Sequence, residues 1–213
     1  MKVLLMGPQG VGKGTYAERL VQKYGIPAIS TGDLFRENIR NNTEIGKKAK
    51  AYMDKGELVP DEITLEILKQ RISKSDCRKG FFLDGFPRTA WQAEMLDKDI
   101  GVDKVLVFTA ADDVIVDRIS GRRICHVCNK IYHIKYIKPK VKGKCDIDGT
   151  ELYQRKDDNE ESIRRRLELY RKETLPVIKH YKKKKIAVEI DSPPIERINA
   201  VIDNVDKALQ DVR

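Results

Sequence analysis

A glycine-rich loop directly after a short apolar run is the feature that most constrains the fold of this chain. Residues 7–15 read Gly-Pro-Gln-Gly-Val-Gly-Lys-Gly-Thr; the apolar run Lys2–Met6 precedes them, and the amphipathic stretch Lys13–Tyr24 overlaps their end. Glycines let the backbone turn so that several amide N–H groups face one concavity, and the N-terminus of a following helix adds positive potential. A phosphate-binding loop between a strand and a helix predicts binding of a nucleoside triphosphate.

The chemistry of such a loop assigns roles to its residues. Lys13 reaches the outer phosphates, and the hydroxyl of Thr15 lies near a magnesium ion. The strict pattern has Ser or Thr directly after the lysine, whereas Gly14 intervenes here. A chance glycine-rich turn is the alternative, and the strand–helix context argues against it. The residues expected to hold the nucleoside triphosphate in this loop are Gly10, Val11, Gly12, Lys13, Gly14 and Thr15.

Short apolar runs alternate with longer amphipathic segments along the chain. Because strands separated by helices need crossover connections, the pattern predicts an α/β fold with a five-stranded parallel sheet between two helical layers. The expected strands are Lys2–Met6, Pro27–Ile29, Phe81–Asp84, Lys104–Phe108 and Ile186–Ile190. The expected helices are Lys13–Tyr24, Asp61–Ser73, Thr89–Leu96, Asp112–Ser120, Asn159–Lys183 and Pro194–Leu209.

Two regions break this alternation. Residues 30–59 contain short helical segments, and residues 122–158 are rich in Gly, Pro, Cys, Tyr and Lys without a sustained helical period. We therefore expect a core domain of residues 1–29, 60–121 and 159–213, a small helical insertion at 30–59, and a β-rich insertion at 122–158.

Three of the four cysteines cluster in the second insertion. Cys125-x2-Cys128 is followed by Cys145-x2-Asp148, and two such pairs can bring four ligands into a tetrahedron around zinc. In an intracellular protein such a cluster favours a metal over a disulfide, which is the weaker alternative. Cys77 stands apart as an ordinary thiol.

The identity of the fourth ligand and of the metal has alternatives. Asp146 and His126 lie close to the cysteines, but neither preserves the paired two-residue spacing that Asp148 has. Zinc, iron and cobalt can all occupy a thiolate-rich tetrahedron. We expect a structural zinc that holds an insertion too small to fold on its own core.

The net charge of +9 fits either nucleic-acid binding or a phosphate-rich small substrate. Part of the excess lies in Lys182 to Lys185, which we interpret as a solvated surface. No apolar run is long enough to cross a bilayer, and the apolar start is too short for a signal peptide, so a cytoplasmic location without a membrane partner is expected.

Several segments together resemble the adenylate kinases. Besides Gly-Lys-Gly-Thr, these are Ser30–Arg36 (Ser-Thr-Gly-Asp-Leu-Phe-Arg), Asp84–Thr89 (Asp-Gly-Phe-Pro-Arg-Thr), Gly121-Arg122-Arg123 and Arg155-Lys156-Asp157-Asp158. The resemblance covers essentially the full length in the same order, and it is to the long-lid bacterial type with a zinc-bearing lid. It implies the reaction MgATP + AMP ⇌ 2 ADP, and it implies that residues 30–59 bind AMP and residues 122–158 form the lid.

Phosphoryl transfer needs alignment of donor and acceptor and neutralisation of spreading negative charge, which predicts many arginines and no protein nucleophile. By the resemblance, Asp84 organises magnesium-bound water with the help of Asp33. The neighbours Arg164 and Arg165 keep the choice of Arg166 open, because helix phase alone does not select among them. The catalytic residues implied are Lys13, Asp84, Arg88, Arg122, Arg155 and Arg166.

The resemblance also implies the nucleotide contacts. Gln92 presents a donor and an acceptor that match an adenine edge. Around AMP the implied residues are Thr31, Arg36, Glu57, Leu58, Val59, Gly85, Phe86, Pro87, Arg88, Gln92, Arg155 and Arg166. Around ATP, outside the loop, they are Arg118, Arg122, Ile131, Tyr132 and Ser192.

Two other functions compete with this one. The nearest is a kinase for another nucleoside monophosphate on the same scaffold. The other is a zinc-ribbon nucleic-acid-binding protein, which the basic surroundings of the cysteines permit but the phosphate loop and the Asp-Gly-Phe-Pro-Arg segment make remote. We expect a monomer acting on ATP, AMP and ADP, without a nucleic-acid partner.

Overall fold

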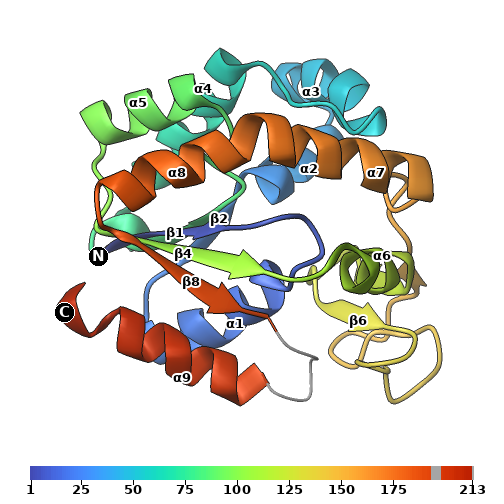
Figure 1. Ribbon diagram of the computed structural model, residues 1–213. Coiled ribbons are helices and arrows are strands. Elements are labelled where there is room, and N and C mark those ends of the chain that lie inside the picture. The colour runs from blue at the N-terminus through green and yellow to red at the C-terminus, as the bar shows by residue number, and fades with distance from the viewer. Residues whose placement is uncertain (193–197, 213) are drawn as a thin grey trace.

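The centre of the molecule is a parallel sheet of five strands in the order β2-β3-β1-β4-β8 (Figure 1). The computed structural model describes residues 1–192 and 198–212. The strands are β1 (Lys2–Met6), β2 (Ala28–Ser30), β3 (Phe81–Asp84), β4 (Lys104–Thr109) and β8 (Ala187–Asp191). The predicted parallel sheet is confirmed, and every strand boundary lies within one residue of its expected place.

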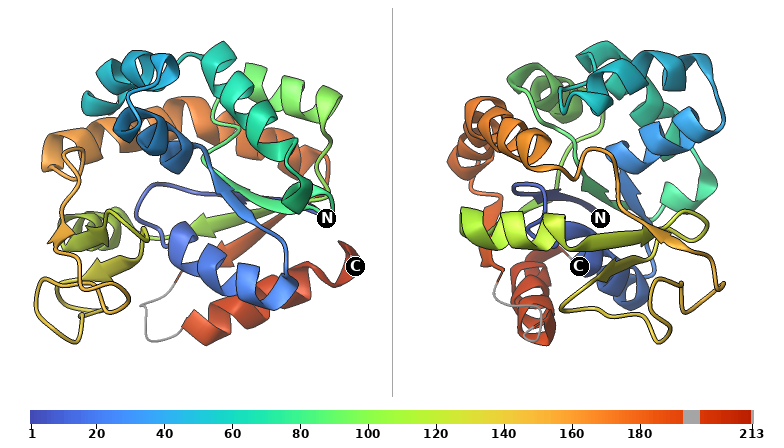
Figure 2. Two further views of the ribbon diagram at one scale, coloured as in Figure 1. Left: turned by 180° about the vertical axis from the view of Figure 1, so that it is seen from behind. Right: turned by 90° about the vertical axis from the view of Figure 1, so that its right-hand side faces the viewer.

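Helices cover both faces of the sheet, as predicted. Helices α1 (Lys13–Tyr24) and α9 (Ile198–Ala208) pack on one face, and α4 (Asp61–Ile72), α5 (Ala90–Asp99) and α8 (Leu175–Lys183) pack on the other (Figures 1 and 2). Alternate side chains of a strand point to opposite faces, so both faces must be apolar and both must be covered. The sheet is therefore covered by helices on both sides.

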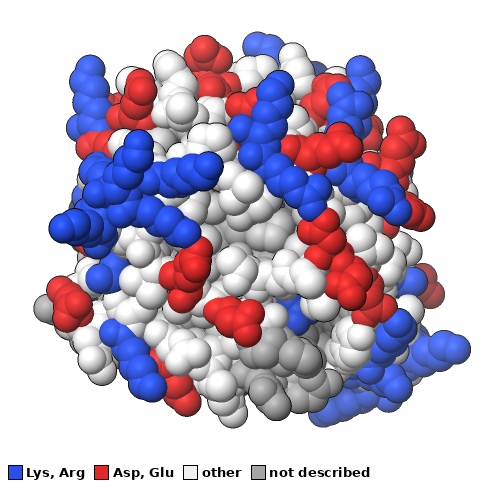
Figure 3. All heavy atoms as spheres, viewed as in Figure 1, with Lys and Arg blue, Asp and Glu red and all other residues white. Residues whose placement is uncertain are grey.

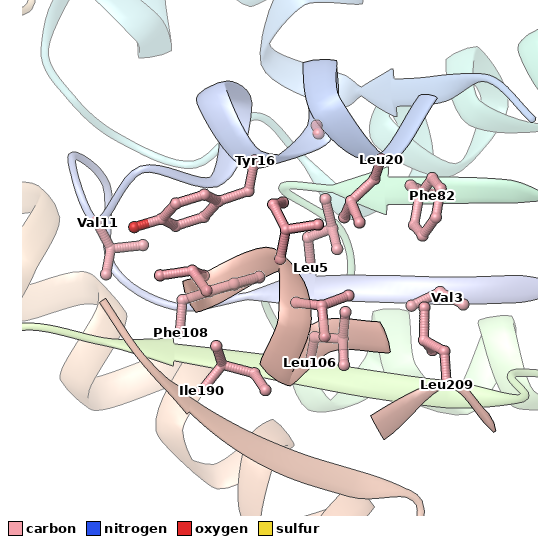
Figure 4. Packing of buried hydrophobic residues seen from close by; sticks show 14 of the residues in the cluster. Val3, Leu5, Val11, Tyr16, Leu20, Phe82, Leu106, Phe108, Ile190 and Leu209 are labelled. Atoms are coloured by element: carbon pink, nitrogen blue, oxygen red, sulfur yellow. The ribbon is translucent and has the colours of Figure 1, made fainter. Parts of the chain in front are cut away.

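Figure 4 shows the packing under α1 and α9. Val3, Leu5 and Phe108 of the strands meet Tyr16 and Leu20 of α1. Tyr16 stacks on Phe108, with ring centroids 5.0 Å apart. Each fully buried side chain of this size stabilises the fold by about 1.5–3 kcal/mol. This packing fixes the start of α1 at the end of β1, which is where the glycine-rich loop lies.

The segment expected as one helix from Asn159 to Lys183 is not regular throughout. It consists of α7 (Glu160–Leu169), a π-helical turn η2 (Tyr170–Thr174) and α8. Pro176 has no N–H to donate to the carbonyl four residues earlier, and the N–H of Leu175 bonds instead to the carbonyl of Tyr170, five residues earlier. The prediction of a regular helix is wrong for the π turn.

The remaining helices agree with the sequence or lie close to it. Helix α6 (Asp112–Ser120) has the predicted bounds, and α5 extends three residues beyond its expected end. The expected start of the last helix at Pro194 lies outside the described residues. Two short 3-10 turns, η1 (Ser75–Cys77) and η4 (Gln210–Val212), complete the core.

Residues 30–59 form the expected helical insertion. Helix α2 (Thr31–Arg40) begins after Ser30, and α3 (Glu44–Asp54) begins after Thr43; each preceding hydroxyl accepts a backbone N–H of the first turn. A small cluster of Phe35, Ala49, Val59 and Ile67 packs the insertion against α4.

Residues 122–158 form the expected β-rich insertion. Its antiparallel strands are β5 (Arg122–Cys125), β6 (Ile131–His133) and β7 (Leu152–Tyr153), in the order β6-β5-β7. Helices α6 and α7 flank its base and pack together through Ile115, Ile119, Ile163 and Leu167. We call this insertion, residues 122–158, the lid.

The surface near the end of α8 is basic. Lys182 to Lys185 are all exposed, and Figure 3 shows Lys and Arg side chains gathered over this end of the helix. Lys182 pairs with Glu189, and Lys184 lies 2.8 Å from the carboxylate of Asp97. The expectation of a solvated lysine run is confirmed. Among the helices of the described ranges, none combines the length and the hydropathy that a membrane span requires.

Candidate active site

Two cavities adjoin at the carboxyl edge of the sheet. The loop cavity, about 190 Å³, lies between the glycine-rich loop and the lid. The insertion cavity, about 150 Å³, lies between α2, α3 and the segment after β3. The walls of both include Lys13, Arg36, Asp84, Gly85, Arg88 and Arg166. The cavities therefore meet at one cluster of charged side chains, at the sheet edge where ligands of open α/β sheets bind.

The glycine-rich loop holds a conformation that larger residues cannot adopt. Gly10 has φ +77°, and a Cβ there would lie 2.5 Å from Cγ1 of Ile119. Lys13 begins α1, and its Nζ donates to the carbonyls of Gly7 and Pro8 at 2.9 Å each. Burial lowers the pKa of Lys13, and Asp84, 3.7 Å away, opposes that shift. The Lys13 side chain therefore folds over the loop, and its ammonium group lies where the two cavities meet.

The turn after β3 presents Arg88 to the same junction. The Nε of Arg88 donates to the carbonyl of Gly85 at 2.8 Å, and the hydroxyl of Thr31 donates to that carbonyl at 2.9 Å. A Cβ at Gly85 would lie 2.8 Å from the Thr31 hydroxyl, so this approach requires glycine. Burial lowers the pKa of Arg88, and the carboxylate of Asp84 opposes the shift.

Arginines of α2 and the lid share one carboxylate. The Nε of Arg36 lies 3.1 Å and an Nη of Arg155 lies 3.3 Å from the same oxygen of Asp33. Burial disfavours the charge of Asp33, but the two arginines outweigh it and lower the pKa of that carboxyl. Burial, and then the charges of Arg36 and Arg122, lower the pKa of Arg155 to about 10. Positive charge is therefore concentrated here beyond what the carboxylates balance.

Two neighbouring carboxylates, Asp157 and Asp158, pair with Arg122 and Arg166. Asp158 has a fully buried side chain and accepts from the Nε of Arg122 at 2.9 Å. Arg166 pairs with Asp157 at 2.8 Å, and burial lowers its pKa. In the described part of the chain, the buried Nε atoms of Arg155 and Arg166 have no hydrogen-bond acceptor. Buried donors without partners are costly, so these two N–H groups are uncompensated in this conformation.

The neighbours of Arg166 point elsewhere. Arg164 pairs with Glu160 on the surface of α7, and Arg165 pairs with Glu57. Only Arg166 of these three lines the two cavities. The register of α7, which helix phase alone left open, thus turns Arg166 toward the site.

Some of the residues predicted to contact ATP line the loop cavity, and others lie behind the glycine-rich loop. Arg118 and Ile131 line the cavity. Val11 and Ser192 do not, because both are buried behind the loop. The Ser192 hydroxyl bonds to the carbonyl of Val11 at 2.5 Å and lies 3.0 Å from an Nη of Arg118, which itself donates to the Val11 carbonyl. These two residues support the loop from behind.

The insertion cavity collects the residues expected around the second nucleotide. Gln92 lies on α5, is 2% exposed, and holds both ends of its amide in hydrogen bonds. The other predicted residues of this wall are Thr31, Glu57, Leu58, Val59, Gly85, Phe86 and Pro87.

The lid contains a four-residue ligand cluster. One ligand atom each from Cys125, Cys128, Cys145 and Asp148 lies within 4.8 Å of all the others. The Sγ atoms of Cys128 and Cys145 are 3.5 Å apart, and an oxygen of Asp148 lies 3.3 Å from the Sγ of Cys125. A tetrahedral zinc with sulfur ligands at about 2.3 Å separates them by about 3.8 Å. The donor set and its spacing therefore fit a tetrahedral metal.

Backbone N–H groups contact the sulfur atoms of this cluster, and the two alternative ligands considered from the sequence lie outside it. The backbone N–H groups of Val127 and Ile147 lie 3.4 and 3.5 Å from the sulfurs of Cys125 and Cys145. Asp146 instead accepts from the N–H of Lys140 at 2.7 Å, and neither it nor His126 belongs to the cluster. The remaining cysteine, Cys77, is buried in the core.

Comparison with known proteins decides the family. The adenylate kinase family model matches residues 5–186. The chain belongs to the adenylate kinase family. It is a transferase of the nucleoside monophosphate kinase class.

Curated adenylate kinases resemble it over nearly the whole length. The adenylate kinase of Clostridium tetani is 48% identical over 98% of both chains. That of Caldicellulosiruptor saccharolyticus is 54% identical over 88% of this chain and 90% of its own. That of Caldanaerobacter subterraneus subsp. tengcongensis is 50% identical over 98% of this chain and 96% of its own.

Sequence reasoning missed several residues of this adenylate kinase site. Asp158 pairs with Arg122 of the lid and Arg166 of α7, and the Arg-Lys-Asp-Asp segment that contains it was a visible signal. His133 and Tyr136 line the loop cavity and stack, with ring centroids 4.5 Å apart. Asp61, which accepts from Gln92, lies at the start of a helix in the sequence, and nothing local connects it to α5.

Proposed function

We propose that the chain catalyses reversible transfer of the γ-phosphoryl group of MgATP to AMP, giving two ADP. The observation that carries this proposal is that two cavities meet over Lys13, Asp84 and Arg88. A donor in the loop cavity and an acceptor in the insertion cavity would bring their phosphates together at that junction. Holding two reactants in line removes much of the entropic barrier to their reaction.

The loop cavity suits the donor. Its backbone amides and the N-terminus of α1 provide N–H groups for the phosphates of ATP, and Lys13 adds charge at the outer phosphates. The lid carries Arg122, Ile131 and Tyr132 over this cavity. In this proposal the lid excludes water, so that the phosphoryl group reaches the acceptor rather than solvent.

The insertion cavity suits the acceptor. Arg36 and Arg88 would hold the phosphate of AMP, and the amide of Gln92 would bind the base. Arg155 and Arg166 would contact the transferred group, which is supported by the two buried Nε donors that lack acceptors in the described residues. Their fixed positive charges would stabilise the oxygens of the transferred group without rearrangement at the moment of transfer.

The residues at the junction also fit magnesium. Asp84 offers carboxylate oxygens, and Thr15 offers a hydroxyl on the wall of the loop cavity. Magnesium bound with ATP would neutralise charge between its outer phosphates. Asp84 would orient water around that ion, and Asp33 would keep Arg36 and Arg155 in place.

The lid cluster fits a structural metal, and we propose zinc. Three thiol groups and one carboxylate fill a tetrahedron and leave no position for water or substrate. Iron and cobalt suit the same donors, so metal analysis of protein purified without added metal distinguishes them. In this proposal the enzyme is a cytoplasmic monomer. Size-exclusion chromatography with light scattering tests the oligomeric state.

A coupled assay with ATP and each nucleoside monophosphate in turn tests the function. We expect AMP to be used with a far higher kcat/KM than GMP, CMP or UMP. Preference for another monophosphate would favour the alternative kinase, and the absence of phosphoryl transfer to every monophosphate would reject the proposal.

A further inference from the structure

The side-chain amide of Gln92 is held from both ends. Its Oε1 accepts the backbone N–H of Arg88 at 2.7 Å, and its Nε2 donates to Oδ1 of Asp61 at 2.7 Å. Gln92 is almost fully buried and lines the insertion cavity. Asp61 does not line that cavity; it lies behind Gln92 as the first residue of α4.

Each of the two partners of the Gln92 amide can play only one role in a hydrogen bond. A backbone N–H can only donate, and an ionised carboxylate can only accept. If the amide turned over, its oxygen would face the Asp61 carboxylate and its NH2 group would face the Arg88 N–H. Both contacts would be repulsive, so the two partners select one orientation of the Gln92 amide.

Asp61 is itself fixed. Its Oδ2 accepts from the Thr89 hydroxyl at 2.8 Å, and that hydroxyl also accepts from the backbone N–H of Gln92 at 3.2 Å. The start of α4, the start of α5 and the Gln92 side chain thus form one closed set of hydrogen bonds.

The amide keeps a second hydrogen on Nε2 and a second lone pair on Oε1. Adenine has an amino donor at position 6 beside ring-nitrogen acceptors, whereas a 6-oxo purine has an acceptor at position 6. We propose that Asp61 is a positioning residue that sets the base specificity of the acceptor site, favouring 6-amino over 6-oxo purines. It acts by keeping Oε1 of Gln92 turned toward the amino group. This inference rests on the proposed function.

A purely structural role for Asp61 makes a different prediction. An acidic residue in the first turn stabilises a helix through its dipole, and the bond to Thr89 joins α4 to α5. Loss of such support would lower stability or total activity. It would not change the ratio between two monophosphates measured on one sample.

The test substitutes Asp61→Asn and compares AMP with inosine monophosphate, which replaces the 6-amino group by an oxo group. The asparagine can turn its NH2 group toward Gln92, so only the Arg88 N–H still opposes the reversed orientation of the Gln92 amide. We expect the kcat/KM ratio of AMP over inosine monophosphate to fall by at least about tenfold, as loss of a charge-assisted hydrogen bond commonly does. The KM for ATP should not change. The ratio is independent of the folded fraction, so partial misfolding does not obscure it.

Asp112→Asn is the matched control, because Asp112 is the first residue of α6 and lines neither cavity. Its ratio should equal that of the wild type. An unchanged ratio in Asp61→Asn, or an equal loss with both monophosphates, would overturn the inference. A wild type that does not use AMP would instead reject the proposed function.

Discussion

The core and the lid both contribute arginines to one site, yet they are held together by different means. In the core, two large clusters of buried apolar residues cover the faces of the sheet. Ile124, His133 and Asp158 of the lid are also buried, but its own apolar cluster consists of Cys125, Tyr132 and Cys145, with Ile137 and Leu152 half-buried beside them. Two of the three residues of this cluster are ligands of the proposed metal. The core is therefore stabilised by hydrophobic burial, whereas the lid lacks a comparable core of its own.

The surface of the lid leads to the same conclusion. Val127 and Ile147 lie beside the ligands and are 60% and 66% exposed. A segment that leaves such residues in water gains little from burial, and small domains of this kind use metals or disulfides instead. The stability of the lid should thus be separable from that of the core, and four substitutions test this separation.

The largest expected effect is on chemistry carried by the core. Lys13→Ala should reduce turnover by at least about 100-fold, because a fixed charge near the transferred group commonly contributes that much. The melting temperature should stay close to that of the wild type, since the ammonium group contacts only loop carbonyls and Asp84. Steady-state rates and thermal melts on the same sample measure both. Lys23→Ala, on the exposed end of α1, is the control, and wild-type turnover in Lys13→Ala would contradict the assignment of the phosphate loop.

Arg88→Ala should have the next largest effect, and on one substrate only. Arg88 lies where the two cavities meet, and the proposal assigns its guanidinium to the phosphate of AMP. We therefore expect affinity for AMP to fall by about 10- to 100-fold, as for loss of a charged hydrogen bond to phosphate. Affinity for ATP should change by less than about threefold. Titration of each nucleotide separately measures this, with the exposed Arg78→Ala as control. Equal weakening of both nucleotides would contradict the assignment of Arg88 to the phosphate of AMP.

The core was more predictable from sequence than the site. Apolar runs such as Lys2–Met6 and Lys104–Phe108 determine buried parallel strands almost by composition, because both faces of the sheet must be apolar. The clustering of Cys125, Cys128, Cys145 and Asp148 was also readable, since two pairs with the same spacing lie close in sequence. The π turn at 170–174 was not predicted, because it follows from a single proline inside a periodic helix pattern.

Contacts between distant segments were beyond the sequence. Arg166 could not be separated from Arg164 and Arg165, because the choice depends on how α7 packs against α6. The Asp61–Gln92 bond joins residues 31 positions apart, through two helix starts whose relative placement only the packed core defines. Local patterns predict elements and ligand pairs, whereas tertiary packing selects which side chains meet.

Loss of the lid metal should have a smaller effect on turnover but a clear one on stability. Cys145→Ser, or removal of the metal with magnesium restored, should lower the temperature at which the lid unfolds by several degrees. Below that temperature, turnover should stay within about threefold of the wild type, since a metal with four protein ligands has no open position for chemistry. Metal content, calorimetry and rate are measured on one sample.

Cys77→Ser is the matched control, because Cys77 is buried in the core and lies outside the ligand cluster. It should keep the full metal content. A melting temperature that does not move in Cys145→Ser would reject the metal cluster. Loss of activity while the lid remains folded would show that the metal has a role beyond structure.

The smallest expected effect concerns the contact between the lid and the helical insertion. Arg40, at the end of α2, donates to the backbone carbonyl of His126, which lies between two ligands of the proposed metal, Cys125 and Cys128. The arginine is exposed, so solvent screens the contact and its contribution should be at most about 1 kcal/mol. Arg40→Ala should therefore raise the KM values of the nucleotides by no more than about fivefold. It should leave the metal content and the melting temperature of the core unchanged, because the contact joins two insertions and supports neither cluster of the core. Arg19→Ala, an exposed arginine of α1, controls for loss of surface charge. A loss of turnover in Arg40→Ala as large as that in Lys13→Ala would mean that the lid position is set by this one contact, and the separation of core chemistry from lid stability would then be wrong.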